Sequence, residues 1–479
     1  MAVFELERER KLEVPEGFLL PELPGERLRT VTLVSAYHDT PDRRLAAAGI
    51  TLRRRTRARS VRWQLKLPAE GGRFEVELAR RGAEPPPEAY EALAAHLRSE
   101  PLVLAATLRT RRLGRRFFRD EVAVADVFHD VVTVDEDAAV RARLDEVEIE
   151  LLPAGDDRDM RRLAKTLRRA GAVAGDERPK VFRVLDLTAG GAPVAADSSP
   201  EGRLAAMLAA HVRAMLVADP AVRLGLGPET LHDFRVATRR IRALLRAARQ
   251  GLDERWAEGL RAELGWLAGE TNEARDLDVL VEELVPRVER LGDPDSGPGA
   301  GLIDALETGR AAARERVLAA LSTPRYFALV DRLVAEAGSP RLSGEGLHLG
   351  ELVAAERRRM RKAARRAAGA ADDAAMHRLR IAGKRVRYAA ELAALPGDRA
   401  GQAFVRAAKD LQDVLGAHQD SVVAEERLRG LAEGGEAAPA LAAGRLVEQE
   451  ARRRARARRD LPAALAALER AGKRWTIAG

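Results

Sequence analysis

The sequence predicts a multi-domain α+β protein, with an N-terminal antiparallel β-barrel tunnel followed by an all-α domain of two related helical bundles. Three observations support this fold class. Apolar and charged residues alternate in short segments over about residues 1–184, and a period of two is typical of β-strands. From Arg203 onward the chain is rich in Ala, Leu, Arg and Glu at helical spacing, which favours helices. This helical half also repeats a charged motif, first at His232 and again at His377.

The strands of the first half are predicted from segments in which every second residue is apolar. Clear examples are residues 62–67 (Arg-Trp-Gln-Leu-Lys-Leu), 73–78 (Arg-Phe-Glu-Val-Glu-Leu) and 146–151 (Glu-Val-Glu-Ile-Glu-Leu). Since successive side chains of a strand point to opposite faces, each segment has one apolar and one charged face.

A stretch of Gly, Pro and Ser separates the two halves at residues 188–202. Such a composition sustains neither a helical nor a strand pattern and is typical of a linker. At 479 residues the chain is also too long for one ordinary core. We therefore expect a tunnel domain at residues 1–187, a linker at 188–200 and a helical domain at 201–479.

The repeat in the helical half consists of a histidine followed by cations at matching positions. His232, Arg235, Arg239, Arg240 and Arg242 recur 145 positions later as His377, Arg380, Lys384, Arg385 and Arg387. A weaker echo follows each copy, at residues 274–279 and 417–422. Two related helical bundles are the simplest interpretation.

Composition excludes several classes of protein. The chain has no cysteine, so disulfides, thiolate catalysis and cysteine-ligated zinc are ruled out. The charged N-terminus lacks the apolar core of a signal peptide. No segment approaches the roughly 18 uninterrupted apolar residues of a membrane span. We expect a cytoplasmic protein without a membrane partner, and its net charge of +8 indicates an anionic partner.

Several of the predicted strands carry charged faces that match one another chemically. Each of these faces is a set of residues two positions apart: Glu7, Glu9 and Lys11; Arg53 and Arg55; Gln64 and Lys66; Glu75 and Glu77; Glu146, Glu148 and Glu150. One charged face usually meets solvent, but several matched faces favour a closed barrel with a charged lumen. Clustered carboxylates would then need a hard divalent cation, and Arg and Lys would hold phosphate oxygens.

The same residues resemble the CYTH domains of the triphosphate tunnel metalloenzymes. The start Glu7-x-Glu9-x-Lys11 looks like the ExExK signature of that family. The similarity continues over about residues 1–187 through residues 37–42 (Tyr-His-Asp-Thr-Pro-Asp), 52–55 (Leu-Arg-Arg-Arg), 63–66, the Glu75 and Glu77 pair, and Glu146-x-Glu148-x-Glu150.

The resemblance implies a role for each matching residue. Metal ligands for one or two Mg²⁺ or Mn²⁺ ions would be Glu7, Glu9, Glu146, Glu148 and Glu150. Triphosphate would be bound by Lys11, Arg53, Arg55, Lys66, Lys180 and either or both of Arg109 and Arg111. The catalytic residues would be Glu9 and Lys11, with a second metal or Lys11 activating water.

The repeated cations of the helical half form a stripe on one helix face. His232, Arg235, Arg239 and Arg242 are spaced at 0, +3, +7 and +10, which places them on one side of a helix. Surface helices usually mix charges of both signs, yet residues 235–251 contain no carboxylate. These residues resemble the conserved histidine α-helical domain, CHAD, over about residues 201–479. The resemblance implies that inorganic polyphosphate binds to both copies of the motif and to His418.

The sequence leaves several functions open. The first is metal-dependent hydrolysis of inorganic triphosphate or short polyphosphate in the tunnel, with polyphosphate bound by the helical domain. Alternatives are a nucleoside or thiamine triphosphatase, and a non-catalytic polyphosphate-binding protein located at polyphosphate granules. Nucleic-acid binding is disfavoured, because only 4% of residues are aromatic and the basic stripes contain none for base stacking.

Overall fold

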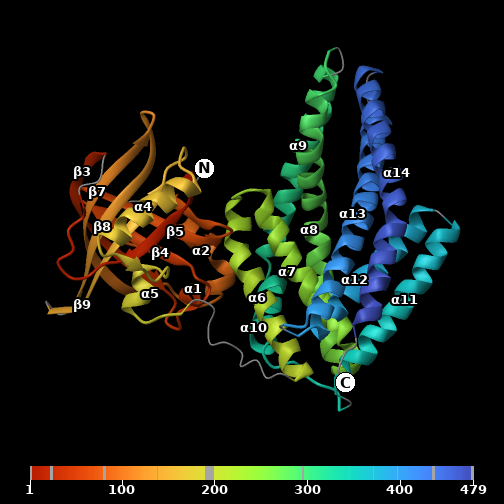
Figure 1. Ribbon diagram of the computed structural model, residues 1–479, viewed down its shortest axis with the longest axis horizontal. Helices are drawn as coiled ribbons and strands as arrows, with labels where there is room; N and C mark the ends of the chain where they lie inside the picture. Colours follow the sequence, from red (N-terminus) through yellow and green to blue (C-terminus); the bar gives the residue numbers. More distant parts are fainter. Residues whose placement is uncertain are drawn as a thin grey trace. The chain divides into compact units, whose positions relative to one another are not determined.

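The computed structural model describes residues 3–21, 25–78, 82–136, 139–188, 199–293, 296–344, 346–370, 372–395, 397–433 and 437–475. Within these ranges the chain divides into two compact units. One unit comprises Met1–Pro193 with Leu216–Thr230, and the other comprises Val194–Met215 with Leu231–Gly479. The first contains the strands and the second is helical (Figure 1), so the predicted fold class is confirmed. Residues 189–198 of the expected linker lie outside the described residues.

The described strands of the first unit form one antiparallel sheet. In chain order they are β1 (Val3–Glu7), β2 (Glu9–Glu13), β3 (Glu26–Asp39), β4 (Thr51–Arg57), β5 (Ser60–Ala69), β6 (Gly72–Leu78), β7 (Val103–Arg119), β8 (Val122–Glu136), β9 (Ala139–Leu151) and β10 (Val173–Ala174). Their order across the sheet is β1-β6-β5-β4-β3-β7-β8-β9-β2-β10.

The sheet closes on itself through its first segment. β1 pairs with β6 and β2 pairs with β9, while only Arg8 separates β1 from β2. One nearly continuous strand is therefore bonded on both sides, which makes the sheet a tunnel. At this closure, a Cβ on Gly72 would stand 2.1 Å from the carbonyl oxygen of Glu7, so β6 must begin with a residue that has no side chain.

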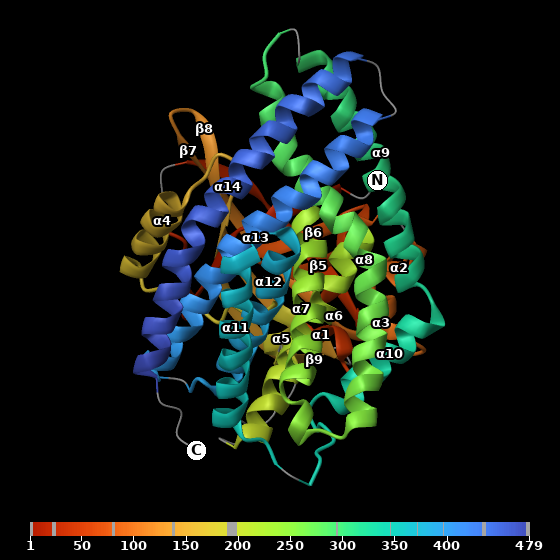
Figure 2. The same cartoon turned by 90° about the vertical axis from the view of Figure 1, so that its right-hand side faces the viewer.

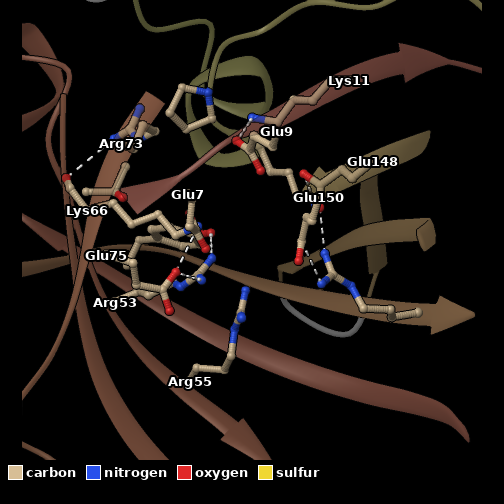
Figure 3. Close-up of a pocket in the computed structure, with 15 residues that line it drawn as sticks. Glu7, Glu9, Lys11, Arg53, Arg55, Lys66, Arg73, Glu75, Glu148 and Glu150 are labelled. Carbon is tan, nitrogen blue, oxygen red and sulfur yellow. Dashed lines mark hydrogen bonds and ion pairs between the residues drawn. The ribbon is translucent and has the colours of Figure 1, made fainter. Parts of the chain in front are cut away.

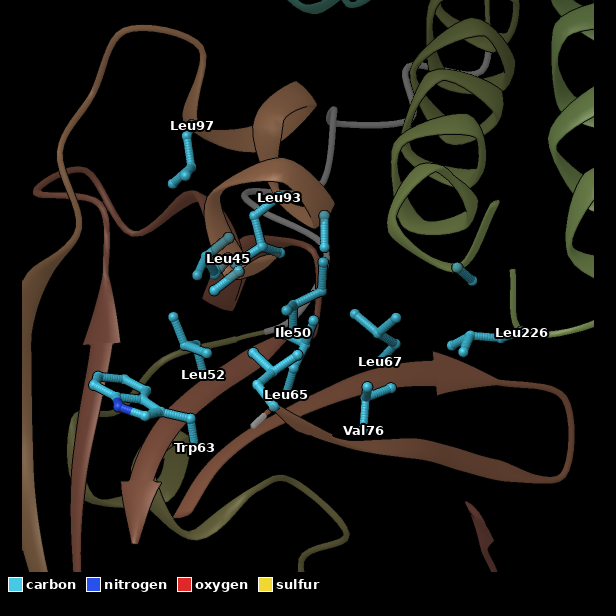
Figure 4. Packing of buried hydrophobic residues seen from close by; sticks show 14 residues of the cluster. Leu45, Ile50, Leu52, Trp63, Leu65, Leu67, Val76, Leu93, Leu97 and Leu226 are labelled. Carbon is cyan, nitrogen blue, oxygen red and sulfur yellow. The ribbon is translucent and has the colours of Figure 1, made fainter. Parts of the chain in front are cut away.

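Apolar residues cover the outside of the tunnel wall. On one side, α4 (Asp157–Arg169) packs its buried Met160, Leu163 and Leu167 onto Val147 and Ile149 of β9. On another, a cluster around Trp63 and Leu65 lies under α1 (Arg44–Ala47), α2 (Pro87–Ala92) and α3 (Ala94–Leu97). Figure 4 shows that Leu226 joins this second cluster beside Leu67 and Val76. Because these apolar faces point outward, the alternate charged faces point into the tunnel.

The end of the first unit's main segment contributes to the inner face of the tunnel. The short helix α5 (Lys180–Val184) packs Val181 and Phe182 against Leu108 of β7 and Val132 of β8. The same cluster contains Tyr37 of β3. This packing positions Lys180, the first residue of α5, toward the charged interior.

The helices of the second half follow the repeat that the sequence predicted. In chain order they are α6 (Pro200–Leu224), α7 (Pro228–Ala247), α8 (Glu254–Glu289), α9 (Ser296–Leu321), α10 (Pro324–Glu336), α11 (Leu349–Ala370), α12 (Asp373–Ala393), α13 (Arg399–Glu433) and α14 (Ala437–Arg474). Adding 145 to the bounds of α7 and α8 gives 373–392 and 399–434, which are those of α12 and α13 within one residue. Helices α6–α9 are therefore repeated as α11–α14, with α10 inserted between the copies (Figure 2).

Helix α6 contributes to both compact units, since its residues from Leu216 onward group with the tunnel unit. This differs from the expectation that all residues after 201 belong to the helical domain. Among the described helices, α6 alone is long and apolar enough to cross a membrane, but 56% of its apolar window is buried within the protein. Its buried Asp219 forms an ion pair with Arg223 at 2.7 Å. Such burial is typical of a core helix.

Candidate functional site

The tunnel encloses a cavity of about 210 Å³ whose lining is almost entirely charged (Figure 3). Strands β1, β2, β4, β5, β6, β7 and β9 and helix α5 supply most of the lining. The lining residues are Glu7, Glu9, Lys11, Tyr37, Thr51, Arg53, Arg55, Lys66, Arg73, Glu75, Arg112, Glu148, Glu150, Pro179 and Lys180.

One side of the cavity is built on β1, β5 and β6 around Lys66. Its Nζ contacts Glu7 and lies 2.9 Å from a carboxylate oxygen of Glu75. Burial raises the pKa of Glu7 to about 7, against the opposing effect of Lys66. Burial would also raise the pKa of Glu75, but Lys66 and Arg53 outweigh it and hold that pKa below its usual range. The pKa values of Glu7 and Glu75 are thus shifted in opposite directions, as expected for two acids that share a site.

The other side of the cavity is built on β7, β8, β9 and α5. Lys180 Nζ lies 2.8 Å from Asp130, 2.7 Å from Glu146 and 2.8 Å from Glu148. Burial alone would lower the pKa of Lys180, but these three carboxylates raise it well above its ordinary value. Arg112 lies 2.6 Å from Asp130 and Glu148. The result is a buried network that fixes the cations before any ligand arrives.

Lys11 lies at the edge of this network and keeps its proton. Its Nζ is 3.1 Å from Glu9 and donates to the backbone carbonyl oxygens of Glu177 and Arg178 at 3.4 and 3.5 Å. Burial would lower the pKa of Lys11, but Glu9 and Glu148 raise it above the ordinary value. A lysine in this state can donate a hydrogen bond to a phosphate oxygen.

Arg55 projects into the cavity and forms no ion pair with a described residue, although Glu75 acts on it from a distance. Its Nε is buried and has no hydrogen-bond partner among the described residues (Figure 3). Burial, together with the charges of Arg53 and Arg112, lowers the pKa of Arg55 to about 10. A phosphate oxygen would supply both the missing acceptor and the missing negative charge.

Two groups of carboxylates lie close enough to share a cation. Oxygens of Glu9, Glu148 and Glu150 lie within 4.8 Å of one another, as do those of Asp130, Glu146 and Glu148. In the second group the Lys180 ammonium already contacts all three acids. The acids of the first group also contact cations, namely Lys11, Lys180 and Arg112. All three of these acids line the cavity, whereas Asp130 and Glu146 do not, so the first group is the one that a hard divalent cation in the cavity can reach.

The structure brings together most, but not all, of the predicted tunnel residues. Glu7 is in neither carboxylate group and contacts Lys66 instead, and Glu146 is fully buried behind Lys180 rather than lining the cavity. Arg109 and Arg111 are exposed on the outer side of β7, so the expectation that either lines the tunnel is wrong. Arg112 takes that place, since β7 pairs it with the buried Asp130.

Several further lining residues were not assigned a role from the sequence, although Glu75 was expected on a charged face of the lumen. They are Tyr37, Thr51, Arg73, Glu75, Arg112 and Pro179. A signal for two of them was present, since Arg73 and Glu75 share the charged face of β6 with Glu77. Glu77 itself pairs with Arg62 at 2.6 Å near the surface, outside the cavity lining.

In the helical unit, the two predicted stripes lie close to one another. The pKa of Lys384 on α12 is lowered to about 7 by burial and by Arg380 and Arg239, while Asp420 opposes the shift. Arg239 is on α7, so cations from both copies share one environment. Arg235 and Arg380 each have a buried nitrogen with no hydrogen-bond partner in the described part of the chain. We call Arg235, Arg239, Arg380 and Lys384 the cationic cluster.

Carboxylates of the second echo accompany this cluster. Asp276 on α8 acts on Arg235, and Asp420 on α13 acts on Arg380. These two residues are 144 positions apart, so the echo at residues 274–279 is displaced by one position from the alignment read from the sequence.

The other predicted polyphosphate ligands make contacts of their own. Arg240 and Arg387 approach Glu391 at 3.9 and 2.7 Å, and His377 bonds Gln419 at 2.8 Å. The Nε of Arg385 is buried without a partner among the described residues. Arg242 lies beside Gly265 of α8, and His232 is half-buried on α7. His418 is only 2% exposed and accepts a hydrogen bond from Arg458 at 3.2 Å, so it does not join the cationic cluster.

Comparison with known proteins agrees with this division of the chain. The family model of the CYTH domain matches residues 5–178, and that of the CHAD domain matches residues 206–429. The chain belongs to the CYTH–CHAD proteins. An uncharacterised protein of Mycobacterium tuberculosis, found in two strains, is 32% identical over 505 aligned residues, which cover 97% of each chain.

Solved structures resemble one domain each. The CHAD domain from the plant Ricinus communis is 29% identical and covers 57% of this chain and 93% of its own, with a TM-score of 0.46. PptA from Streptomyces chartreusis is 25% identical and covers 57% of this chain and 99% of its own, with a TM-score of 0.44. HpAC1 from Hippeastrum, described as having a dominant triphosphatase activity, is 19% identical and covers 38% and 98%, with a TM-score of 0.26.

Membership of this family assigns a class of chemistry to the tunnel. CYTH domains are metal-dependent tunnel enzymes associated with triphosphates, and the acidic groups described above suit a metal ion. The CYTH domain of this chain therefore has both the scaffold and the donor set of its class.

Proposed function

We propose that the CYTH tunnel hydrolyses inorganic triphosphate or short polyphosphate with Mg²⁺, and that the CHAD domain binds longer polyphosphate. The observation that carries the first part is Arg55, a half-buried cation that points into the cavity and whose buried Nε has no hydrogen-bond partner among the described residues. Burying an unpaired charge is unfavourable, so its presence is best explained by an anion that completes the site.

The lining of the cavity favours an inorganic substrate. Twelve of its fifteen lining residues are Asp, Glu, Lys or Arg types, and its volume is about 210 Å³. Sites for organic ligands are usually larger, about 300–1,000 Å³, and mostly apolar. The adenine of ATP or the rings of thiamine triphosphate would find little apolar surface inside the tunnel.

The residues support a division of labour during hydrolysis. Arg53, Arg55 and Lys66 would bind the phosphate oxygens. The ammonium group of Lys11 would donate a hydrogen bond to one of these oxygens. A divalent cation held by Glu9, Glu148 and Glu150 would neutralise charge on the transferring phosphoryl group. Water then adds across one P–O–P bond, which converts triphosphate into diphosphate and orthophosphate without a covalent enzyme intermediate.

The second part of the proposal is supported by the cationic cluster of the helical domain. Its cations come from both copies of the repeat, and nitrogens of Arg235 and Arg380 lack partners among the described residues. Cations about one helical turn apart, roughly 5.4 Å, can contact successive phosphates of a flexible chain. Binding would release condensed counterions and weaken with salt.

A parallel assay of three substrates tests the catalytic proposal. Phosphate release would be measured from tripolyphosphate, ATP and thiamine triphosphate, each with Mg²⁺ and with excess EDTA. We expect the highest kcat/KM for tripolyphosphate and loss of release in EDTA. Faster turnover of ATP or thiamine triphosphate would assign the tunnel to an organic triphosphate, and release that survives EDTA would contradict the metal-dependent mechanism.

A further inference from the structure

A second basic surface lies on α11, on residues that neither the charged tunnel nor the cationic cluster includes. Five cations of this helix line a surface hollow of about 580 Å³. They are Arg358, Arg361, Lys362, Arg365 and Arg366, and no other residue type lines it. Their spacing of three and four residues places them on one side of the helix. We call this set the α11 face.

Most of the α11 face has no counter-charge. Arg361 is paired with Glu469 at 2.8 Å, whereas Arg358, Lys362, Arg365 and Arg366 have no ion pair with any residue that the structure describes. All four are exposed, and residues 357–370 contain no carboxylate. Like charges four residues apart repel by about 0.2–0.5 kcal/mol per pair, so the face is unfavourable for the helix alone.

Another arginine-rich run shows that this arrangement is unusual for the domain. On α14, residues 452–459 contain six arginines. There Arg453 lies 2.6 Å from Glu283, Arg454 lies 2.6 Å from Glu425, and Arg458 lies 2.6 Å from Asp373. Density of arginine in the sequence therefore does not by itself produce an unbalanced surface. The α11 face differs because neighbouring helices supply only one acid to it.

The sequence repeat allows the α11 face to be compared with the equivalent positions in the first copy. Helix α11 corresponds to α6 with the same displacement of 145 residues. Arg361, Lys362, Arg365 and Arg366 thus correspond to Leu216, Val217, Pro220 and Ala221. In the first copy this segment groups with the tunnel unit, and Ala221 is buried in its hydrophobic cluster. One copy uses these positions for apolar packing, and the other carries four cations there.

We propose that the α11 face binds inorganic polyphosphate, as a contact surface separate from the cationic cluster. This inference rests on the proposed function of the CHAD domain and extends it to a second site. The face contains no aromatic side chain on which a nucleobase could stack, while its exposed cations suit a dense linear anion. A chain held at two surfaces gains affinity through its raised effective concentration.

The test compares full-length variants that lose the same charge at different places. One variant combines Lys362→Gln, Arg365→Gln and Arg366→Gln. The matched control combines Arg316→Gln, Arg429→Gln and Arg452→Gln, three exposed helical arginines that each already pair with a glutamate. A third variant, Arg239→Glu with Lys384→Glu, reports on the cationic cluster. Binding of labelled long-chain polyphosphate would be titrated at several salt concentrations, with unlabelled polyphosphate or single-stranded DNA as competitor.

We expect the α11 variant to bind long-chain polyphosphate about tenfold more weakly, with a log–log salt slope smaller by about 2, since three phosphate contacts are lost. The control should stay within about twofold of the wild type. If the α11 variant matches the control while the Arg239 and Lys384 variant loses binding, the α11 face is not a polyphosphate surface but the proposed function stands. If neither variant changes binding, the proposed function fails as well. Stronger competition by DNA for the α11-dependent binding would assign the face to nucleic acid and overturn the proposal.

Discussion

The tunnel and the helical domain both concentrate charge, but they balance it differently. In the tunnel, Lys180 and Arg112 are enclosed by carboxylates of the same wall, with five contacts of 2.6–2.8 Å. In the helical domain, four cations of the α11 face lack partners among the described residues, and Asp276 and Asp420 act on Arg235 and Arg380 of the cationic cluster. The wall around Lys180 and Arg112 is thus balanced internally, whereas most of the α11 face is not balanced by any described residue.

This difference is consistent with the proposed division between catalysis in the tunnel and capture by the helical domain. A transition state is stabilised most when its charged neighbours are fixed beforehand, as ion pairs fix them in the tunnel. A polyanion of variable length needs no such precision, and exposed cations bind it through counterion release.

Glu9→Ala should cause the largest loss. Glu9 belongs to the carboxylate group that faces the cavity and lies 3.1 Å from Lys11, so its removal weakens both metal binding and the position of the lysine. We expect tripolyphosphate turnover to fall by about 10²–10³-fold, with the fold retained by circular dichroism. Glu77→Ala is the control, because Glu77 lies outside the cavity lining and pairs with the exposed Arg62. Equal activity of both variants would remove Glu9 from the site.

Arg55→Ala should weaken substrate binding while stabilising the protein. Arg55 has no ion pair among the described residues, and burial together with Arg53 and Arg112 lowers its pKa to about 10 against the weaker opposing effects of Tyr37 and Glu75. Loss of its bonds to a phosphate should raise KM by about 10–100-fold. The melting temperature without substrate should rise, because one of three mutually repelling arginines is gone. Arg57→Ala, at the exposed end of the same strand, should change neither quantity. A lower melting temperature for Arg55→Ala would mean that this arginine is structural.

Arg112→Lys and Arg111→Lys test which face of β7 looks inward. Arg112 spans Asp130, Glu148 and Glu150, and a lysine keeps the charge but cannot reach several acids with a planar fork. We expect kcat/KM for tripolyphosphate to fall about tenfold for Arg112→Lys and to stay unchanged for Arg111→Lys. The reverse result would show that Arg111, which was predicted from the sequence, binds the substrate in place of Arg112.

The error at β7 shows what the sequence could and could not provide. Alternation identified the inward faces of β1, β2 and β4 because their opposite faces carry few charges, namely Arg10 of β2 and Arg54 of β4. Residues 109–116 carry arginines on both faces, at 109, 111, 112, 115 and 116, so their alternation selects neither. The register of β3 against β7 also shifts between Leu28 and Val31, close to Arg112. The pairing of β7 with β8 places Arg112 opposite the buried Asp130, and this pairing shows that the Arg112 side chain points into the tunnel.

The helical half was predictable in its repeat but not in its charge balance. Displacement by 145 residues recovered α7, α8, α12 and α13, because a repeated motif requires repeated local structure. Ion pairing between helices depends on which faces meet, and this is not contained in a local pattern. The burial of His418 and the pairing of residues 452–459 follow from helix packing. The lack of charge partners for most of the α11 face, among the described residues, has the same origin.

The smallest expected effect is a pH dependence of polyphosphate binding that originates at Lys384. Its pKa is lowered to about 7 by burial and by Arg380, Arg239 and Arg235, with Asp420 alone opposing. In the free protein this amine therefore loses its charge as pH rises through about 7, whereas a bound polyanion favours the charged form. Binding must then take up a proton above that pH and weaken as pH rises.

Between pH 6 and pH 8 we expect the Kd for polyphosphate to rise several-fold, and by at most about tenfold if Lys384 alone titrates. Lys384→Arg keeps the cation charged throughout this range, so this variant should bind polyphosphate equally at both pH values. Lys473→Arg on α14 is the control for replacing a lysine by an arginine elsewhere in the domain. Measurements at constant ionic strength are needed, because salt acts on every phosphate contact. A Kd that is the same at pH 6 and pH 8 in the wild type would mean that Lys384 is charged before polyphosphate arrives. If the Kd of Lys384→Arg still depends on pH, another group is responsible for that dependence. In both of these outcomes the cationic cluster would be charged before polyphosphate binds, as the cations of the tunnel are.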